Sequence, residues 1–124
     1  MVVSQDILDA IKTAALAEFD PSSHIGFGSG TTTPSPLDTD LTTPIVRKPF
    51  DEVPVKNITN GTYDFATTLA LTEGNGSNVS EVALFDALTA GTMFNKKLLS
   101  YVIAKDATKE FSVGMRVTIE VTNS

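Results

Sequence analysis

The clearest pattern of hydrophobic and polar positions lies near the C-terminus, where apolar residues occupy every second position of residues 111–121. Polar residues or glycine fill the positions between them. A period of two predicts a β-strand, and a strand with one apolar and one polar face favours antiparallel pairing. The apolar positions are Phe111, Val113, Met115, Val117, Ile119 and Val121.

The same period of two recurs in residues 63–72. The preceding Asn60-Gly61 pair is typical of a tight hairpin turn, because both residues tolerate positive φ angles. Residues 82–85 are apolar at every position, which predicts a short central strand buried on both faces.

Two further extended segments are less regular. Residues 92–103 predict a strand whose alternation breaks near residues 96–99, so we expect a bulge there. Residues 44–58 predict an edge strand or an irregular strand, because Pro49 and Pro54 lack an amide donor.

A helical period marks the N-terminus, where residues 4–19 predict a single helix. Ser4 is a suitable N-cap, and Asp20-Pro21 ends the helix because a residue before proline disfavours helical geometry. A helix of this length needs a surface to pack on, either its own sheets or a neighbouring subunit. Its predicted apolar stripe consists of Ile7, Ile11, Ala14 and Ala15, with Leu8 and Phe19 beside it.

Residues 22–43 contain a short predicted strand from Ser23 to Phe27 and then a long loop from Gly28 to Thr43. The loop is rich in glycine, threonine and proline, which excludes a helix. Loops longer than about 12 residues are usually functional or mobile.

One helix followed by about six strands predicts a mainly β fold, an antiparallel β-sandwich. We expect a single domain over residues 1–124, made of the helix (4–19), a strand with the long Gly/Thr/Pro loop (22–43) and the sandwich strands (44–124). The residues expected to be largely buried are Leu84, Phe85, Val113, Val117 and Ile119.

Charge and composition narrow the function classes. The net charge is −6, with 15 acidic and 9 basic residues, and direct binding of nucleic acid needs a basic face. The absence of cysteine excludes disulfides and thiolate metal sites. No apolar run has the length of a membrane span and the N-terminus lacks signal-peptide features, so we expect synthesis and folding in a cytoplasm without membrane insertion.

Candidate chemistry is sparse. His24 is the only histidine, and a catalytic triad would have to combine it with nearby Ser22 or Ser23 and Asp20, although adjacency in sequence does not build a triad. The glycines between Gly26 and Gly30 are followed by threonines, whereas a phosphate-binding loop requires Gly-Lys-Ser/Thr. Structural roles are the better interpretation of both.

Loop acids are the remaining candidates for a cation site. Asp38, Asp40, Asp51 and Glu52 lack the ligand order and the glycine of a calcium loop. We therefore expect no metal, no cofactor and no catalytic residue, and we interpret these acids as solvated loop residues.

Three stretches of the sequence, taken together, resemble a known protein family. They are Ile25-Gly26-Phe27-Gly28-Ser29-Gly30-Thr31-Thr32-Thr33-Pro34 with Asp38-Thr39-Asp40-Leu41 and Ile45-Val46-Arg47-Lys48, then Glu81-Val82-Ala83-Leu84-Phe85-Asp86, and then Thr89-Ala90-Gly91-Thr92-Met93-Phe94 with Val102-Ile103-Ala104-Lys105. Their order and spacing resemble small tail-fibre-like or virion structural proteins of tailed bacteriophages and archaeal tailed viruses. The chain differs from that pattern at Phe27 and Ser29, at Ala83 in place of glycine, and at residues 95–97.

The resemblance implies a non-enzymatic virion protein that is assembled in the host cytoplasm. We expect it on the particle surface, as a capsid decoration or turret protein, because a tail fibre usually needs a long shaft sequence and this chain has none. The resemblance also implies a homo-oligomer, most simply a trimer, that contacts other virion proteins such as the major capsid or tail proteins. The long loop and the helix are the expected contact elements, because each leaves apolar side chains that a neighbour can cover. The candidate contact residues are Ile7, Ile11, Ala15, Leu37 and Leu41.

Two alternatives remain open. The family is used at more than one place on the particle, so a tail-tip, baseplate or tail-fibre protein that touches a host surface receptor is the second hypothesis. A carbohydrate-binding module is the third, since a β-sandwich can serve that purpose. Such modules usually present aromatic platforms, whereas this chain has no tryptophan and, as tyrosines, Tyr63 and Tyr101.

Overall fold

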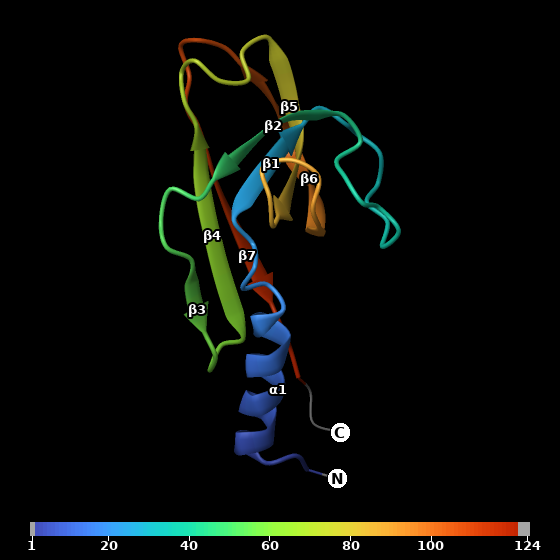
Figure 1. The fold of residues 1–124 in the computed structure, drawn as a ribbon, viewed down its shortest axis with the longest axis vertical. Helices are drawn as coiled ribbons and strands as arrows, with labels where there is room; N and C mark the ends of the chain where they lie inside the picture. Colours follow the sequence, from blue (N-terminus) through green and yellow to red (C-terminus); the bar gives the residue numbers. More distant parts are fainter. Residues whose placement is uncertain (1, 122–124) are drawn as a thin grey trace.

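The computed structural model describes residues 2–121, which form one helix and seven strands in two antiparallel sheets (Figure 1). The predicted mainly β, antiparallel fold with an N-terminal helix is confirmed, whereas the strands number seven rather than about six. The elements are α1 (Gln5–Ala17), β1 (His24–Gly28), β2 (Pro44–Pro49), β3 (Val55–Asn57), β4 (Thr62–Leu69), β5 (Ser77–Phe85), β6 (Met93–Lys105) and β7 (Phe111–Thr118).

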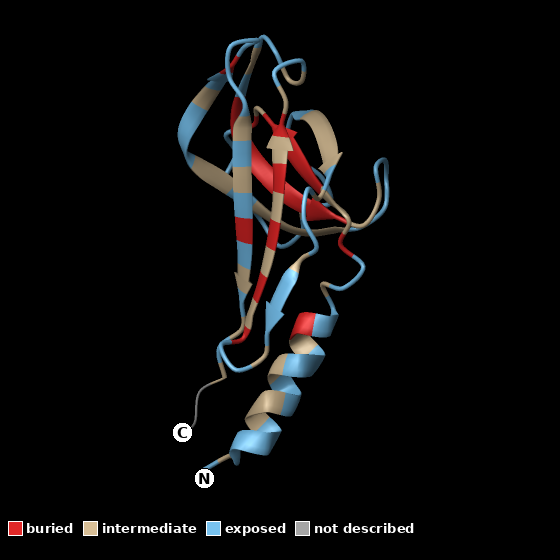
Figure 2. Cartoon of the chain, turned by 90° about the vertical axis from the view of Figure 1, so that its left-hand side faces the viewer, coloured by how far each residue is buried: buried red, intermediate tan, exposed pale blue. Residues whose placement is uncertain are grey.

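The two sheets share one hydrophobic core. The four-stranded sheet has the order β2-β1-β5-β6, and the three-stranded sheet has the order β3-β4-β7. Side chains from both sheets and one side chain from α1 meet between them, and the red bands of Figure 2 mark these buried positions. The buried members are Leu16, Ile25, Phe27, Tyr63, Phe65, Leu69, Val79, Val82, Leu84 and Met115.

Strand β5 is the buried centre of the four-stranded sheet. It lies between β1 and β6, and residues 79–85 are all buried. The prediction of a central strand with both faces covered is therefore confirmed, as is the predicted burial of Leu84 and Phe85. One face of β5 faces the three-stranded sheet, and the other carries a second, smaller cluster of Leu41, Ala83 and Phe85.

The alternation predicted for the last strand is confirmed, but its apolar residues are less buried than predicted. Met115 is buried, but Val113, Val117 and Ile119 are half-buried, because β7 is the edge of its sheet and no strand within residues 2–121 pairs with its other side. The strand also ends at Thr118. In the sequence the alternation continues to a polar residue, Thr122, which lies outside the described residues.

The bulge in β6 lies closer to the C-terminus than expected. Lys96, Lys97 and Leu98 pair regularly with Ala83, Val82 and Glu81. The next pair is Ile103 with Val79, so four residues of β6, 99–102, lie opposite one residue of β5, Ser80, and the irregularity falls there. The extra residues restore the alternation after the bulge, as expected, but at a different position.

The segment predicted as one irregular edge strand divides into two strands that belong to different sheets. Strand β2 is an edge of the four-stranded sheet, and β3 is an edge of the three-stranded sheet. The following turn forms the predicted hairpin, because β3 pairs antiparallel with β4 and Gly61 has a φ angle of 67°.

Helix α1 begins after Ser4, whose hydroxyl accepts a hydrogen bond from the Ile7 amide at 3.4 Å. The face that packs on the sheets differs from the predicted stripe. Leu16 is the buried residue of the helix, whereas the predicted Ile7, Ile11 and Ala14 are exposed. The residues on the packed side are Leu8, Lys12, Ala15, Leu16 and, after the helix, Phe19.

Polar contacts tie the helix to the three-stranded sheet. The Lys12 ammonium donates to the Thr59 carbonyl at 2.9 Å. Beyond the helix, Asp20 accepts a hydrogen bond from the Tyr63 hydroxyl at 2.8 Å and pairs with Lys56 at 2.8 Å. Hydrogen bonds from Lys56 and Tyr63 lower the pKa of Asp20.

Tyr63 is expected to ionise late. Burial, together with the Asp20 carboxylate, raises the pKa of Tyr63 to about 12. Since folding raises this pKa above the ordinary value near 10, its contribution to stability is complete below pH 10 and is lost as the pH rises toward 12. In a Tyr101→Phe background, tyrosinate absorbance should report a midpoint near the higher value. A midpoint near 10 in the folded protein would contradict the contact with Asp20.

Candidate contact site

The long loop, residues 29–43, is called the arm below. It leaves the end of β1, projects to one side of the molecule and returns to β2 (Figure 1). Its base is closed by a hydrogen bond from the Ser29 amide to the Thr43 carbonyl at 2.9 Å. A second bond, from the Ser80 hydroxyl to the Gly30 carbonyl at 2.6 Å, attaches it to β5.

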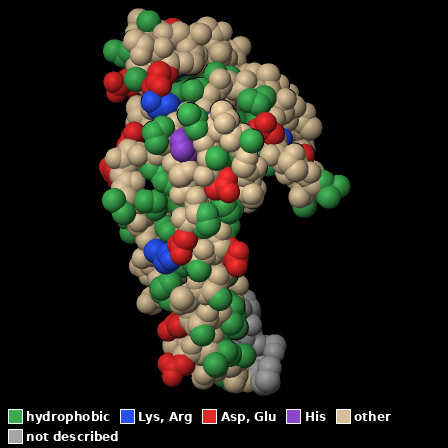
Figure 3. Space-filling view, in the orientation of Figure 1, with side chains coloured by type: hydrophobic (Ala, Val, Ile, Leu, Met, Phe, Trp, Pro, Cys, Tyr) green, Lys and Arg blue, Asp and Glu red, His purple; other side chains and the backbone are tan. Residues whose placement is uncertain are grey.

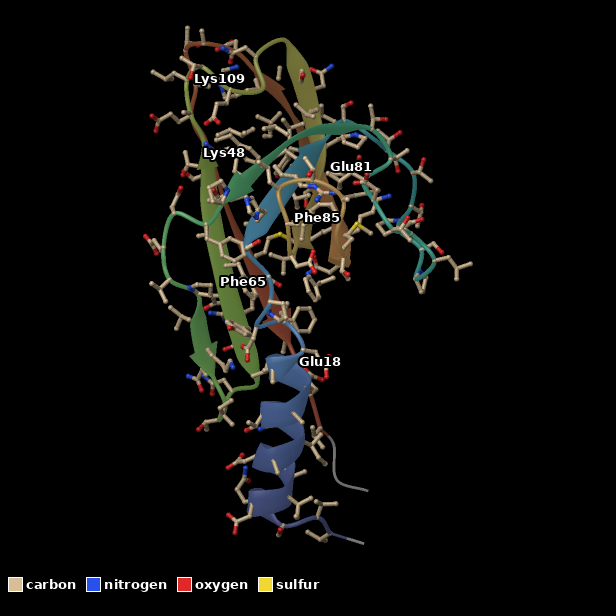
Figure 4. The ribbon with its side chains drawn as sticks, viewed as in Figure 1. Glu18, Lys48, Phe65, Glu81, Phe85 and Lys109 are labelled. Atoms are coloured by element: carbon tan, nitrogen blue, oxygen red, sulfur yellow. The ribbon has the colours of Figure 1, made fainter. Side chains whose placement is uncertain are left out.

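Glu81 is the centre of the attachment. Its side chain is fully buried on the face of β5 that the arm covers, and Figure 4 shows it beside the arm's base. The carboxylate accepts a hydrogen bond from the Thr43 amide at 2.9 Å through Oε1. Its Oε2 atom has no hydrogen-bond partner among the described residues and lies 3.9 Å from the Lys96 ammonium. The buried carboxylate therefore holds the arm through the Thr43 hydrogen bond and lies beside Lys96 of β6, which supplies the counter-charge.

Lys96 extends this attachment toward the outer part of the arm. Its nearly buried ammonium pairs with Asp38 at 3.2 Å and donates to the Thr42 hydroxyl at 2.9 Å and the Asp40 carbonyl at 3.4 Å. A hydrogen bond from the Ser35 amide, followed by that from Lys96, lowers the pKa of Asp38. Residues 38–43 are thus clamped on the sheet by charges supplied by β5 and β6.

The glycines at the start of the arm make room for Glu81. A Cβ atom at Gly28 would lie 2.8 Å from the Glu81 Cγ and 2.8 Å from the Thr43 carbonyl oxygen. One at Gly30 would lie 2.7 Å from Glu81 Oε2. These distances leave no space for a side chain, which explains the glycine motif without a bound phosphate.

Arg47 holds the turn after β5 against the same face. Its guanidinium donates to the carbonyls of Ala87 at 2.9 Å and Ala90 at 2.7 Å. It also lies over the Phe85 ring at 3.5 Å from the centroid. Ala90 and Gly91 have positive φ angles of 53° and 71°, so this turn is tightly bent.

The five predicted contact residues have different surroundings. Leu37 is 89% exposed at the end of the arm, and Ile7 and Ile11 are 53% and 44% exposed on the helix. Figure 3 shows hydrophobic atoms at both places. Ala15 is half-buried against its own chain. Leu41 is 5% exposed and packs on Ala83 and Phe85, so the prediction that a neighbouring subunit accepts it is wrong.

The residues near His24 do not assemble into a triad. The Ser23 hydroxyl lies 2.6 Å from Nδ1 of His24, but Asp20 is bound to Tyr63 and Lys56 instead. Burial, and next the charge of Arg47, lower the pKa of His24.

Two further observations concern metal sites and membrane spans. Among residues 2–121, no group of three or more His, Cys, Asp or Glu side chains is arranged to hold a metal ion. Asp38 and Asp40 lie near Lys96 and Arg47, respectively. The described residues include no helix that is long and apolar enough to cross a membrane.

Sequence reasoning missed Glu81, Lys96 and Arg47. The signal at Glu81 was a carboxylate directly before a fully apolar run, where a buried charge requires a partner. The position of that partner could not be inferred from the sequence, because Lys96 follows a turn and Thr43 precedes β5 by many residues.

Comparisons with known proteins give no assignment. No protein-family model matches the chain, and no curated protein matches it significantly.

Proposed function

We propose that the chain is a non-enzymatic structural protein of a tailed virus, placed on the particle surface as a capsid decoration or turret protein. One observation carries the proposal. Part of each of the three stretches that resemble virion proteins lies at a single place, the outer face of the four-stranded sheet. Gly28 and Gly30 of the first stretch pack on Glu81 of the second, and Arg47 binds the carbonyl of Ala90 in the third.

This arrangement suits a protein that repeats one contact around a symmetry axis. The two sheets give a stiff body, and the contacts of Glu81 and Lys96 with the arm fix the direction in which it projects. The exposed tip of the arm and the exposed side of α1 then present Leu37, Ile7 and Ile11 to neighbours. Closed symmetry covers these side chains in every copy and leaves no open contact. The resemblance favours a trimer.

The same surface also suits a tail-tip, baseplate or tail-fibre protein, in which the arm would touch a host receptor. The carbohydrate-binding alternative gains no support. Tyr63 is buried in the core, which leaves Tyr101 as the exposed tyrosine, and the chain has no tryptophan.

Cryo-electron microscopy of the virus that encodes the chain tests the placement. We expect density for the fold on the capsid surface, with the arm and helix at protein contacts. Density at the tail would favour the tail alternative. A particle that lacks the chain, or isolated monomers whose arm and helix both face solvent, would refute the proposal.

Assembly is expected to depend on the exposed side of α1. Replacing both residues in Ile7→Gln/Ile11→Gln should weaken homo-oligomerisation by roughly 100-fold, because burial of each isoleucine stabilises a contact by about 1.5 kcal/mol or more. Folding should change little, since both side chains are exposed in the single chain. Sedimentation and incorporation into particles are the measurements.

Leu88→Gln is the matched control, because it makes the same chemical change at an exposed residue far from the helix in sequence. Equal sedimentation of the double variant and the unmodified protein would exclude the helix as a contact element.

A further inference from the structure

The two sheets have four edges, and three of them are protected against pairing with another chain. Strand β2 has proline at both ends and an irregular register beside β1. Strand β3 has three residues and follows Pro54. Strand β6 carries Lys96, Lys97 and its bulge. Prolines, lysines, bulges and short length are the usual devices that prevent edge-to-edge association.

Strand β7 has none of these devices. It pairs with β4 through eight consecutive residues without a register shift, and it contains no proline or lysine. The Ile119 amide donates to Gly61 on the β4 side at 2.7 Å. Since successive residues of a strand alternate in direction, Ser112, Gly114 and Arg116 direct their amides to the free edge. In residues 2–121 no strand pairs with that edge.

The space beside this edge is open and partly apolar. Strands β6 and β7 belong to different sheets, and a groove of about 400 Å³ lies between them. Its apolar lining includes Leu99, Val113 and Met115, and its polar lining includes Lys97 and Arg116. A second hollow of about 230 Å³ adjoins it, formed by Leu99, Ser100, Tyr101, Ile103 and Phe111. Half-buried core residues therefore meet solvent along this side of the molecule.

We propose that β7 pairs antiparallel with β7 of a second copy, with Val113 opposite Val113 of that copy on a two-fold axis. An added strand must place apolar side chains in the groove at every second position and polar side chains on the outer face. Strand β7 itself has this pattern, so two copies satisfy one another. The pairing would join the two three-stranded sheets into one six-stranded sheet.

Charge complementarity selects the register. With Val113 at the centre, Glu110 of each copy lies opposite Arg116 of the other, whereas a register centred on Met115 would oppose Glu110 and Glu120. Arg116 binds Asp64 through Nε and Nη2 at 2.7 and 3.0 Å. Its Nη1 has no partner among the described residues, so it remains free to donate to Glu110 of the second copy.

The two-fold contact is separate from the contacts that the helix and arm make in the proposed function. An isologous contact closes on itself and adds no open surface. It can join two trimers, or it can act alone. Its test is therefore made in the Ile7→Gln/Ile11→Gln background, where failure of one contact does not hide the other.

A single introduced cysteine can report the register between the two β7 strands, because the natural chain contains no cysteine. Residues opposite one another at a non-hydrogen-bonded position have Cα atoms about 4.5 Å apart, within the range that a disulfide spans. Under mild oxidation, Val113→Cys should form a covalent dimer in high yield. Ser112→Cys is the matched control: it faces Gly114 of the second copy, and its own counterpart lies beyond about 7 Å.

The outcomes are distinct. A dimer from Val113→Cys and none from Ser112→Cys supports the proposal. A dimer from Gly114→Cys or Met115→Cys in place of Val113→Cys overturns the register. Accessible thiols with no covalent dimer at any of these positions overturn the pairing, as does a particle in which β7 pairs with a different protein.

Backbone substitution at Gly114 gives an independent measurement. Gly114→Pro removes an amide that faces the free edge, and by symmetry two hydrogen bonds between copies, while the bonds to β4 remain. Sedimentation should show dimerisation weakened by roughly tenfold or more. Gly114→Ala retains the amide, and its added Cβ meets nothing within 4 Å, so it should dimerise like the parent. Equal dimerisation of the two variants overturns the proposal.

Discussion

Lys96→Met is expected to lower the free energy of unfolding by about 3–5 kcal/mol, because it leaves a buried charge without its counter-charge. The Glu81 carboxylate is fully buried, and Lys96 is the cation that lies beside it, at 3.9 Å. Methionine has a similar length and retains the packing of the lysine stem. The loss of stability is therefore electrostatic. It includes the loss of the contacts that the Lys96 ammonium makes with Asp38 and Thr42.

Urea unfolding of three variants separates these contributions. Lys97→Met removes the exposed neighbouring lysine and should change stability by no more than about 0.5 kcal/mol. Glu81→Gln/Lys96→Met should recover much of the loss, because glutamine still accepts the Thr43 amide hydrogen bond without a charge. If Lys96→Met and Lys97→Met unfolded at the same urea concentration, Glu81 would not depend on Lys96.

The parts of the fold that the sequence could predict are the elements with a local signal. Strands β4, β5 and β7 were recognisable because their burial follows from local periodicity: Tyr63, Phe65 and Leu69 alternate with half-buried neighbours. Helix α1 was recognisable from Ser4 and Asp20-Pro21. Hydrophobic periodicity and the residues that begin or end a helix are local properties of the sequence. They indicate the same element in almost any tertiary structure.

Contacts between distant segments could not be predicted in the same way. The helical stripe of Ile7 and Ile11 is as apolar as the side that packs, so the sequence does not show which side meets the sheets. Leu41 looked like an unsatisfied loop residue because its partners, Ala83 and Phe85, lie far along the chain. The position of the bulge depended on which residues of β5 each part of β6 meets.

The glycine motif illustrates how a candidate site changes meaning once the structure is known. The sequence correctly suggested that these glycines allow close contact, but not what they contact. Gly28 and Gly30 lie against Glu81, whereas Gly26 lies under an aromatic ring of the same strand, β5. These three positions therefore require glycine because side chains of β5 lie against them, and not because a ligand binds there.

Phe85→Ala is expected to destabilise the protein by about 3–5 kcal/mol, the usual cost of removing a fully buried aromatic ring. The ring lies across Gly26 of the neighbouring strand and contributes to the cluster with Leu41. Its other side carries the Arg47 guanidinium, at 3.5 Å from the ring centroid. Removal of the ring would leave a cavity under the arm and free Arg47 from one of its contacts.

Gly26→Ala tests whether the ring determines the glycine. In the parent protein, the new Cβ would lie 2.5 Å from the Phe85 ring and 3.2 Å from Leu41, and this overlap should cost about 1–3 kcal/mol. In the Phe85→Ala background the space is vacant, so the same substitution should be nearly neutral, giving a coupling of about 1–3 kcal/mol in thermal or urea unfolding. Gly114→Ala, which meets no atom, should cost the same in both backgrounds. Equal costs for Gly26→Ala with and without the ring would mean that the backbone of β1, rather than Phe85, requires glycine at this position.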